Sequence, residues 1–169
     1  MQKKTRFIVY SGVIAALYLV LTHLQNLLVP DSTSWAVQFR ASEALCVLAL
    51  FTPAAIPGLT LRCLLFNITY AEALPLDFLL GSLASCLAAA SMYLTRRLTV
   101  RGYPLIAMCM PALWNAILVG GELTVYIGGG FPLNAAMVAL GELAVLLTLG
   151  SVLYYAIRLR HLDSRLFAA

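Results

Sequence analysis

Apolar runs long enough to cross a lipid bilayer recur along almost the whole chain, and they constrain its fold more than any other feature. Hydrophobic residues make up 62% of the sequence and charged residues only 11%, which excludes an ordinary soluble domain. A spanning α-helix needs about 20 residues, so a chain of 169 residues has room for about six or seven crossings. The sequence therefore predicts an all-α integral membrane protein, with residues 1–169 forming a single transmembrane domain.

Prolines, glycines and polar stretches divide the apolar sequence into six predicted transmembrane helices. We expect these helices at about residues 7–29, 40–52, 54–70, 75–95, 103–126 and 132–159. The second and third are short for a crossing, because Pro53 and Pro57 interrupt the apolar pattern. We expect these two to pack on longer neighbours rather than to lie in lipid.

Nine of the eleven Lys and Arg residues occur in three groups, and an even number of predicted crossings separates each group from the next. The groups are Lys3, Lys4 and Arg6; Arg96, Arg97 and Arg101; and Arg158, Arg160 and Arg165. An excess of Lys and Arg marks the cytoplasmic loops of membrane proteins. The sequence therefore predicts that both termini lie in the cytoplasm.

The stretch from Trp35 to Glu43 combines an indole, an amide, a guanidinium and a carboxylate within an otherwise apolar chain. Arg40 and Glu43 are three residues apart and would share one face of a helix. Charges at the edge of a hydrocarbon slab are costly unless they are paired or hydrated, so the stretch is a candidate functional site. The alternative is an interfacial anchor, in which Trp35 lies in an aromatic belt and Arg40 and Glu43 neutralise each other.

Further polar side chains fall mainly toward the outer half of the predicted helices. Asn115 and Glu122 are seven residues apart and project from one side of their helix, and Glu142 lies two turns deeper than Asn134. These residues suggest a polar pocket that opens to the outside. The predicted ligand-binding residues are Trp35, Gln38, Arg40, Glu43, Asn67, Trp114, Asn115, Glu122, Asn134 and Glu142.

Two other charged residues fall within predicted helices. Arg62 lies near the middle of its helix, where an arginine must face protein, water or a carboxylate. The sequence does not fix its partner, although Glu142 is one candidate. Asp77 comes in the first turn of its helix, and complementing the helix dipole is enough to explain it.

Other functional classes have little support in the sequence. The chain has no HExxH or GxSxG motif and no paired histidines, so we do not expect an enzyme. The four cysteines stand singly in apolar runs, which favours small core residues over metal ligands or disulfides. A predicted pocket with two tryptophans, amides and carboxylates instead suits a planar polar heterocycle, because indoles stack on a flat ring and carboxylates accept from its edge.

Several blocks of the sequence resemble the QueT family. The most specific are Gln38–Glu43 (QFRASE) and Phe51–Gly58 (FTPAAIPG), and Gly81–Ala84 and Gly141–Leu143 agree with them. The resemblance implies a substrate-binding S component of an energy-coupling factor (ECF) transporter in a bacterial plasma membrane. Such a protein captures a 7-deazaguanine-type precursor of the nucleoside queuosine from outside the cell.

The same resemblance implies partners. An S component assembles with a transmembrane coupling protein and with two cytoplasmic ATPases that use ATP, and no cofactor is implied in this chain. Small residues of the first helix meet the coupling protein in S components, and Ser11, Gly12, Ala15 and Ala16 match that position. Packing against the protein's own helices is the alternative explanation for such a motif.

The resemblance leaves the ligand open among a small aminomethyl base, a nitrile base and the larger free base queuine. Two alternatives to the whole interpretation also remain. One is an S component for another vitamin, such as a flavin or a pteridine, and the other is a membrane scaffold that transports nothing.

Overall fold

The fold is helical throughout the described part of the chain. A computed structural model describes residues 3–29, 39–69 and 76–166, and these contain helices and no β-strand. The predicted all-α class is therefore confirmed.

Seven α-helices, one 3₁₀ helix and one π-helical segment occur in the described residues. In chain order they are α1 (Lys3–Leu28), the 3₁₀ helix η1 (Ala41–Leu50), α2 (Ala55–Thr69), α3 (Asp77–Thr95), α4 (Leu105–Tyr126), α5 (Phe131–Val145), the π-helical segment η2 (Leu146–Gly150), α6 (Ser151–Leu159) and α7 (Leu162–Leu166). The elements α5, η2 and α6 follow one another without a break, where the sequence predicts one helix at 132–159. The short α7 was not predicted.

Four helices of the described chain are long and apolar enough to cross a membrane: α1, α3, α4 and the continuous helix Phe131–Leu159. The 10 residues of η1 rise by about 20 Å and the 15 residues of α2 by about 22 Å. Both lengths fall short of a hydrocarbon core about 30 Å thick. By length and composition the structure supports four spans, and the six predicted crossings stay a prediction.

The short helix η1 lies at the centre of the bundle, where it contacts each of α1 to α6 and the segment η2. Val47 and Ala49 of η1 have no exposed surface. Val47 packs against Gly150, where an added Cβ would lie 3.1 Å from its Cγ2 atom. The sequence predicted a helix at 40–52, and the structure has a 3₁₀ helix there instead. Runs of 3₁₀ helix this long are uncommon, and packing on every side of η1 offsets its weaker hydrogen-bond geometry.

Glycines set two of the closest helix contacts. An added Cβ on Gly58 of α2 would lie 2.8 Å from the carbonyl oxygen of Ser11 in α1. An added Cβ on Gly120 of α4 would lie 2.8 Å from the Cα of Ala135 in α5. Side chains at these two glycines would push the helix pairs apart, so the sequence specifies which helices lie side by side.

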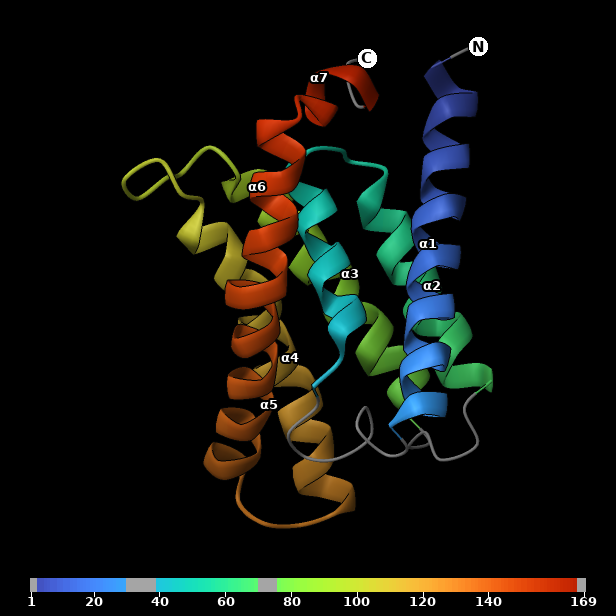
Figure 1. The fold of residues 1–169 in the computed structure, drawn as a ribbon. Helices are drawn as coiled ribbons and strands as arrows, with labels where there is room; N and C mark the ends of the chain where they lie inside the picture. The colour runs from blue at the N-terminus through green and yellow to red at the C-terminus, as the bar shows by residue number, and fades with distance from the viewer. Residues whose placement is uncertain (1–2, 30–38, 70–75, 167–169) are drawn as a thin grey trace.

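Both chain ends lie at one end of the bundle, together with the loop between α3 and α4 (Figure 1). The turn between α4 and α5 lies at the opposite end (Figure 1). All three basic groups therefore belong to the end that carries the termini, which agrees with an even number of crossings between them. That this end faces the cytoplasm stays a prediction.

Candidate functional site

A buried ion pair links η1 to α2. Each carboxylate oxygen of Glu43 accepts from Nη2 of Arg62 at 3.3 Å, and both side chains are almost fully buried. The hydroxyl of Tyr18 in α1 donates to Glu43, and the Arg62 guanidinium lies 3.6 Å from the centre of the Tyr18 ring. Cys46 donates to the other carboxylate oxygen at 3.1 Å. Because a buried charge is costly without such partners, these contacts bind three helices together.

This pairing answers a question that the sequence left open. From the sequence, Glu142 was one candidate partner for Arg62, whereas the structure pairs Arg62 with Glu43. Glu43 also does not form the pair with Arg40 considered for an interfacial anchor. Arg40 precedes η1 with an extended backbone, and its guanidinium lies 5.5 Å from the centre of the Phe66 ring.

A small polar cavity of about 20 Å³ adjoins the ion pair. Its walls come from η1, α2, α3, α4 and α5 and from the residue before η1. The lining residues are Arg40, Glu43, Arg62, Cys63, Asn67, Asp77, Gly81, Ser85, Asn115, Val119 and Glu142. Five of the predicted ligand-binding residues are among them: Arg40, Glu43, Asn67, Asn115 and Glu142. The cavity lies in the half of the bundle nearer the α4–α5 turn, since Asn67 is close to the end of α2 and Asp77 begins α3.

Several polar atoms around the polar cavity have no hydrogen-bond partner within the described chain. They are Nε of Arg62, Oδ1 of Asn67 and Oε2 of Glu142. The other ends of the same side chains are engaged: Nδ2 of Asn67 donates to the Asp77 carbonyl at 2.7 Å, and Nδ2 of Asn115 donates to Oε1 of Glu142 at 2.5 Å. Buried polar atoms are nearly always paired, so one donor and two acceptors here are available to a ligand.

One wall of the polar cavity was not predicted as part of the site. Asp77, Gly81 and Ser85 lie four residues apart on one face of α3, and this spacing is the signal that could have found them. An added Cβ on Gly81 would lie 3.0 Å from Nδ2 of Asn67 and 3.2 Å from Oδ1 of Asp77. Glycine at position 81 therefore keeps the cavity open.

Glu122 lies close to the polar cavity but does not line it. It follows Asn115 and Val119 on the same face of α4, one turn nearer the α4–α5 turn. Its side chain is buried, and neither carboxylate oxygen has a hydrogen-bond partner among the described residues.

The remaining predicted ligand-binding residues lie elsewhere. Nδ2 of Asn134 donates to Oγ1 of Thr124 at 3.0 Å and to the Gly128 carbonyl at 2.9 Å, so Asn134 ties the α4–α5 turn together. The indole of Trp114 donates to Oγ of Ser91 at 3.1 Å and is not part of the cavity wall. Trp35 and Gln38 lie outside the described residues. Within the described chain, no group of three or more His, Cys, Asp or Glu side chains could hold a metal ion.

Comparison with known proteins assigns the chain to a family. The sequence model of the QueT transporter family matches residues 8–159, which is nearly the whole chain. The chain belongs to the QueT transporter family. No curated protein and no solved structure matches it. Family membership, together with four apolar helices of spanning length, makes this QueT family member a membrane transport protein.

The small residues of α1 in this QueT family member divide into two faces. Oγ of Ser11 donates to the Ala54 carbonyl at 2.9 Å and Ala15 is buried, so both face the protein's own helices. Gly12 and Ala16 are exposed, and an added Cβ on Gly12 would meet nothing within 4 Å. Internal packing accounts for the first face, and only the second is available to a partner.

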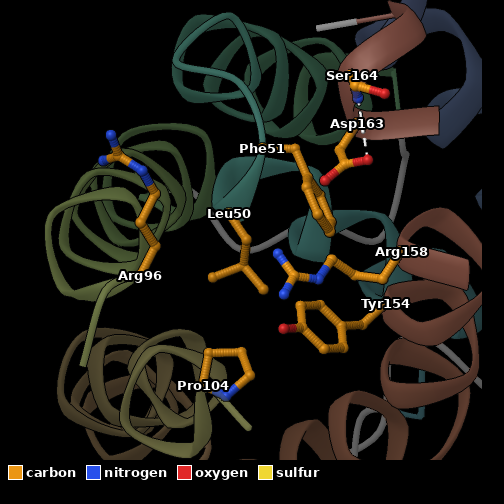
Figure 2. A pocket seen from close by; sticks show the side chains of 8 residues that line it. All are labelled: Leu50, Phe51, Arg96, Pro104, Tyr154, Arg158, Asp163 and Ser164. Atoms are coloured by element: carbon orange, nitrogen blue, oxygen red, sulfur yellow. Dashed lines mark hydrogen bonds between the residues drawn. The ribbon is translucent and has the colours of Figure 1, made fainter. Parts of the chain in front are cut away.

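A larger hollow of about 330 Å³ lies at the end of this QueT family member that carries the termini (Figure 2). It is lined by Leu50, Phe51, Arg96, Pro104, Tyr154, Arg158, Asp163 and Ser164. Figure 2 shows the Arg158 guanidinium pointing between Leu50 and Tyr154. Arg96 instead donates to the Tyr93 carbonyl at 2.5 Å. None of the predicted ligand-binding residues lines this hollow.

Proposed function

We propose that this QueT family member is the substrate-binding S component of an ECF-type ABC importer in a bacterial plasma membrane. Its ligand is a 7-deazaguanine-type precursor of queuosine captured from outside the cell. The observation that carries the proposal is the set of unpartnered buried polar atoms around the polar cavity, within a chain of a transporter family. Ligand sites in proteins combine an apolar enclosure with a few such convergent polar groups.

The unpartnered atoms complement the edge of a guanine-like base. Such an edge carries two kinds of donor, a ring N–H and an exocyclic amine, next to a carbonyl acceptor. Oε2 of Glu142 and Oδ1 of Asn67 are acceptors, and Nε of Arg62 is a donor. This assignment uses every unpartnered atom of the polar cavity wall. Trp35 stays a predicted stacking residue and Gln38 a predicted amide contact, whereas the predicted stacking role of Trp114 does not fit a ligand in this cavity, since Trp114 is not part of its wall.

The proposal requires the polar cavity to open when ligand enters. Its volume of about 20 Å³ holds about one water molecule, and a bicyclic base is several times larger. Asn67, Asn115 and Glu142 line the cavity from three different helices, so separating these side chains would enlarge it.

The larger hollow is a weaker substrate site under this proposal. It lies at the basic end of the bundle, and the distribution of arginines and lysines predicts that this end faces the cytoplasm. A substrate captured from outside would have to reach the polar cavity first. The exposed Gly12 and Ala16 offer the coupling protein a flat surface on α1, and the two ATPases would supply energy from ATP.

A ligand titration on the purified chain in detergent, followed by tryptophan fluorescence, tests the proposal. We expect 7-deazaguanine precursors to bind and riboflavin, thiamine and guanine to bind far more weakly. Tight binding of a flavin or pteridine alone would overturn the substrate class while keeping the S-component architecture. Absence of binding by a folded sample would favour a scaffold.

Gly81→Ala locates the site within the chain. The added methyl group contacts Asn67 and Asp77 at 3.0–3.2 Å and fills the cavity, so we expect affinity to fall by about tenfold or more. Gly121→Ala is the matched control, because its added Cβ would meet nothing within 4 Å. Equal affinity of the two variants would place the ligand elsewhere.

A further inference from the structure

Two hydrogen-bond donors of α6 point into the larger hollow at the basic end of the bundle. Figure 2 shows the Arg158 guanidinium and the Tyr154 hydroxyl reaching from α6 into the space beside Leu50 and Pro104. Neither donor has a hydrogen-bond or ion-pair partner among the described residues. Tyr154 is only 7% exposed, and buried polar groups are nearly always paired. Both donors are therefore available to an acceptor that enters the hollow.

The Tyr154 ring is held by aromatic neighbours from other parts of the chain. Phe51, at the end of η1, stacks on it with the ring centres 5.8 Å apart. Tyr103, which precedes α4, meets it edge-on at the same distance. Arg158 lies one turn farther along α6, with its guanidinium 5.9 Å from the centre of the Tyr154 ring. The hydroxyl is thus presented by a fixed ring, so little ordering opposes its binding to a ligand.

The charges at the hollow favour an anion. Arg96 and Arg158 line it against one acid, Asp163, and Oδ1 of Asp163 accepts from the backbone N–H of Ser164 at 2.9 Å. The other acidic residues of the described chain lie on or beside the polar cavity, in the other half of the bundle. Positive charge is therefore in excess here, and a guanidinium matches the oxygens of a phosphate group.

The hollow lies at the level where the long apolar helices end. Arg96 directly follows α3, and Arg158 belongs to the last turn of the apolar helix Phe131–Leu159. Tyr155 beside the hollow is 49% exposed, and tyrosines are enriched where a membrane protein meets the lipid headgroups. Basic pockets between spanning helices at this level bind the headgroups of anionic lipids.

We propose that the larger hollow binds the phosphate group of an anionic phospholipid. Arg158 and Tyr154 donate to the phosphate oxygens, and Arg96 adds to the positive field. Leu50 and Phe51 offer an apolar wall to the glycerol carbons beside the phosphate, which a free phosphate ion lacks. The volume of about 330 Å³ is in the range of small-ligand pockets. The inference does not depend on the substrate proposed for the polar cavity, which lies in the other half of the bundle.

Native mass spectrometry of the full chain in detergent tests the inference. The probes are phosphatidylglycerol and phosphatidylcholine with the same acyl chains. We expect phosphatidylglycerol to bind about fivefold or more tightly, because phosphatidylcholine carries a cation beside its phosphate. Equal binding of the two lipids would overturn the inference. Inorganic phosphate in molar excess should leave phosphatidylglycerol bound, and its displacement would overturn a lipid as the occupant.

Two matched pairs of variants locate the lipid in the hollow. Arg158→Gln should lower the affinity for phosphatidylglycerol by about tenfold, as loss of a charge-assisted hydrogen bond predicts. Arg160→Gln removes the same charge from an exposed residue outside the hollow and should change the affinity by less than about twofold. Tyr154→Phe keeps the ring packing and should lower the affinity by about threefold to fivefold, whereas Tyr155→Phe should leave it unchanged.

A variant of the opposing acid checks the sign of the electrostatic argument. Asp163→Asn should raise the affinity for phosphatidylglycerol by about twofold to threefold, because it removes a like charge from the wall. Equal losses in Arg158→Gln and Arg160→Gln would show a diffuse effect of charge and overturn the site. If Arg158→Gln does not fold, equal affinities of Tyr154→Phe and Tyr155→Phe would overturn it instead. Binding of 7-deazaguanine probes should be the same in all these variants, so the outcome is separate from that of the proposed function.

Discussion

Arg62 is a charged residue buried inside the helix bundle. Its guanidinium is buried midway along a helix, held between the Glu43 carboxylate and the face of the Tyr18 ring. Removing one member of a buried ion pair leaves the other charge uncompensated, which costs about 3–5 kcal/mol. We therefore expect Arg62→Met to lower the melting temperature in detergent strongly.

A double substitution separates the contribution of the Glu43–Arg62 ion pair to stability from the contributions of the two individual residues. Glu43→Gln combined with Arg62→Met should be less destabilising than the sum of the two single changes, because neither charge is then left unpaired. Arg160→Met is the control, since Arg160 is exposed and belongs to the basic end. Additive effects of the two single substitutions would show that the ion pair contributes little to stability.

The candidate site was predictable from the sequence only as a set of residue types. Intramembrane acids and amides are rare, so Asn67, Asn115 and Glu142 were identified by their chemistry alone. The partner of Arg62 was not, because several acidic residues were available and only the packing of η1 brings Glu43 to it. Asn134 has the same chemistry as Asn115 but is used to tie a turn, and no periodicity separates these two uses.

At the scale of the helices, close contacts at glycines determine which helices pack side by side. Gly120 and Gly121 are neighbours on α4 and provide a matched pair, because a Cβ on Gly120 would lie 2.8 Å from the backbone of Ala135 while one on Gly121 would meet nothing within 4 Å. We expect Gly120→Ala to lower the melting temperature, by separating α4 from α5. Gly121→Ala should leave it unchanged or raise it slightly, since alanine favours a helix by about 1 kcal/mol over glycine. Equal effects of the two substitutions would contradict this account of the α4–α5 contact.

The sequence predicts the helical class, but it does not predict which apolar segments lie in lipid and which are enclosed by other helices. Apolar runs and their proline and glycine breaks predict helices, because a chain in lipid must satisfy its backbone internally. Whether a short apolar segment lies in lipid or inside the protein depends on its neighbours. The segment at 41–50 is a 3₁₀ helix enclosed by all the long helices, and its sequence alone looks like an ordinary apolar helix.

At the scale of the whole molecule, the two ends of the bundle differ in chemistry. One end carries the termini, the α3–α4 loop and the three basic groups (Figure 1). The other half holds the polar cavity and the buried Glu122. A bilayer with anionic lipids on its cytoplasmic side attracts the basic end, so this asymmetry predicts both the orientation of the chain and the direction from which substrate arrives.

Cysteine labelling in intact cells tests that orientation. Ile127 at the α4–α5 turn is 68% exposed and Leu98 in the α3–α4 loop is 54% exposed, so a cysteine at either position is accessible to a reagent on its own side. We expect a membrane-impermeant maleimide to label Ile127→Cys in intact cells and Leu98→Cys only after permeabilisation. The unsubstituted chain sets the background, because Cys46 and Cys63 are buried and Cys86 and Cys109 are half-buried. Labelling of Leu98→Cys but not of Ile127→Cys in intact cells would place the basic end outside. The polar cavity would then lie toward the cytoplasm, and capture of a substrate from outside the cell through this cavity would be excluded.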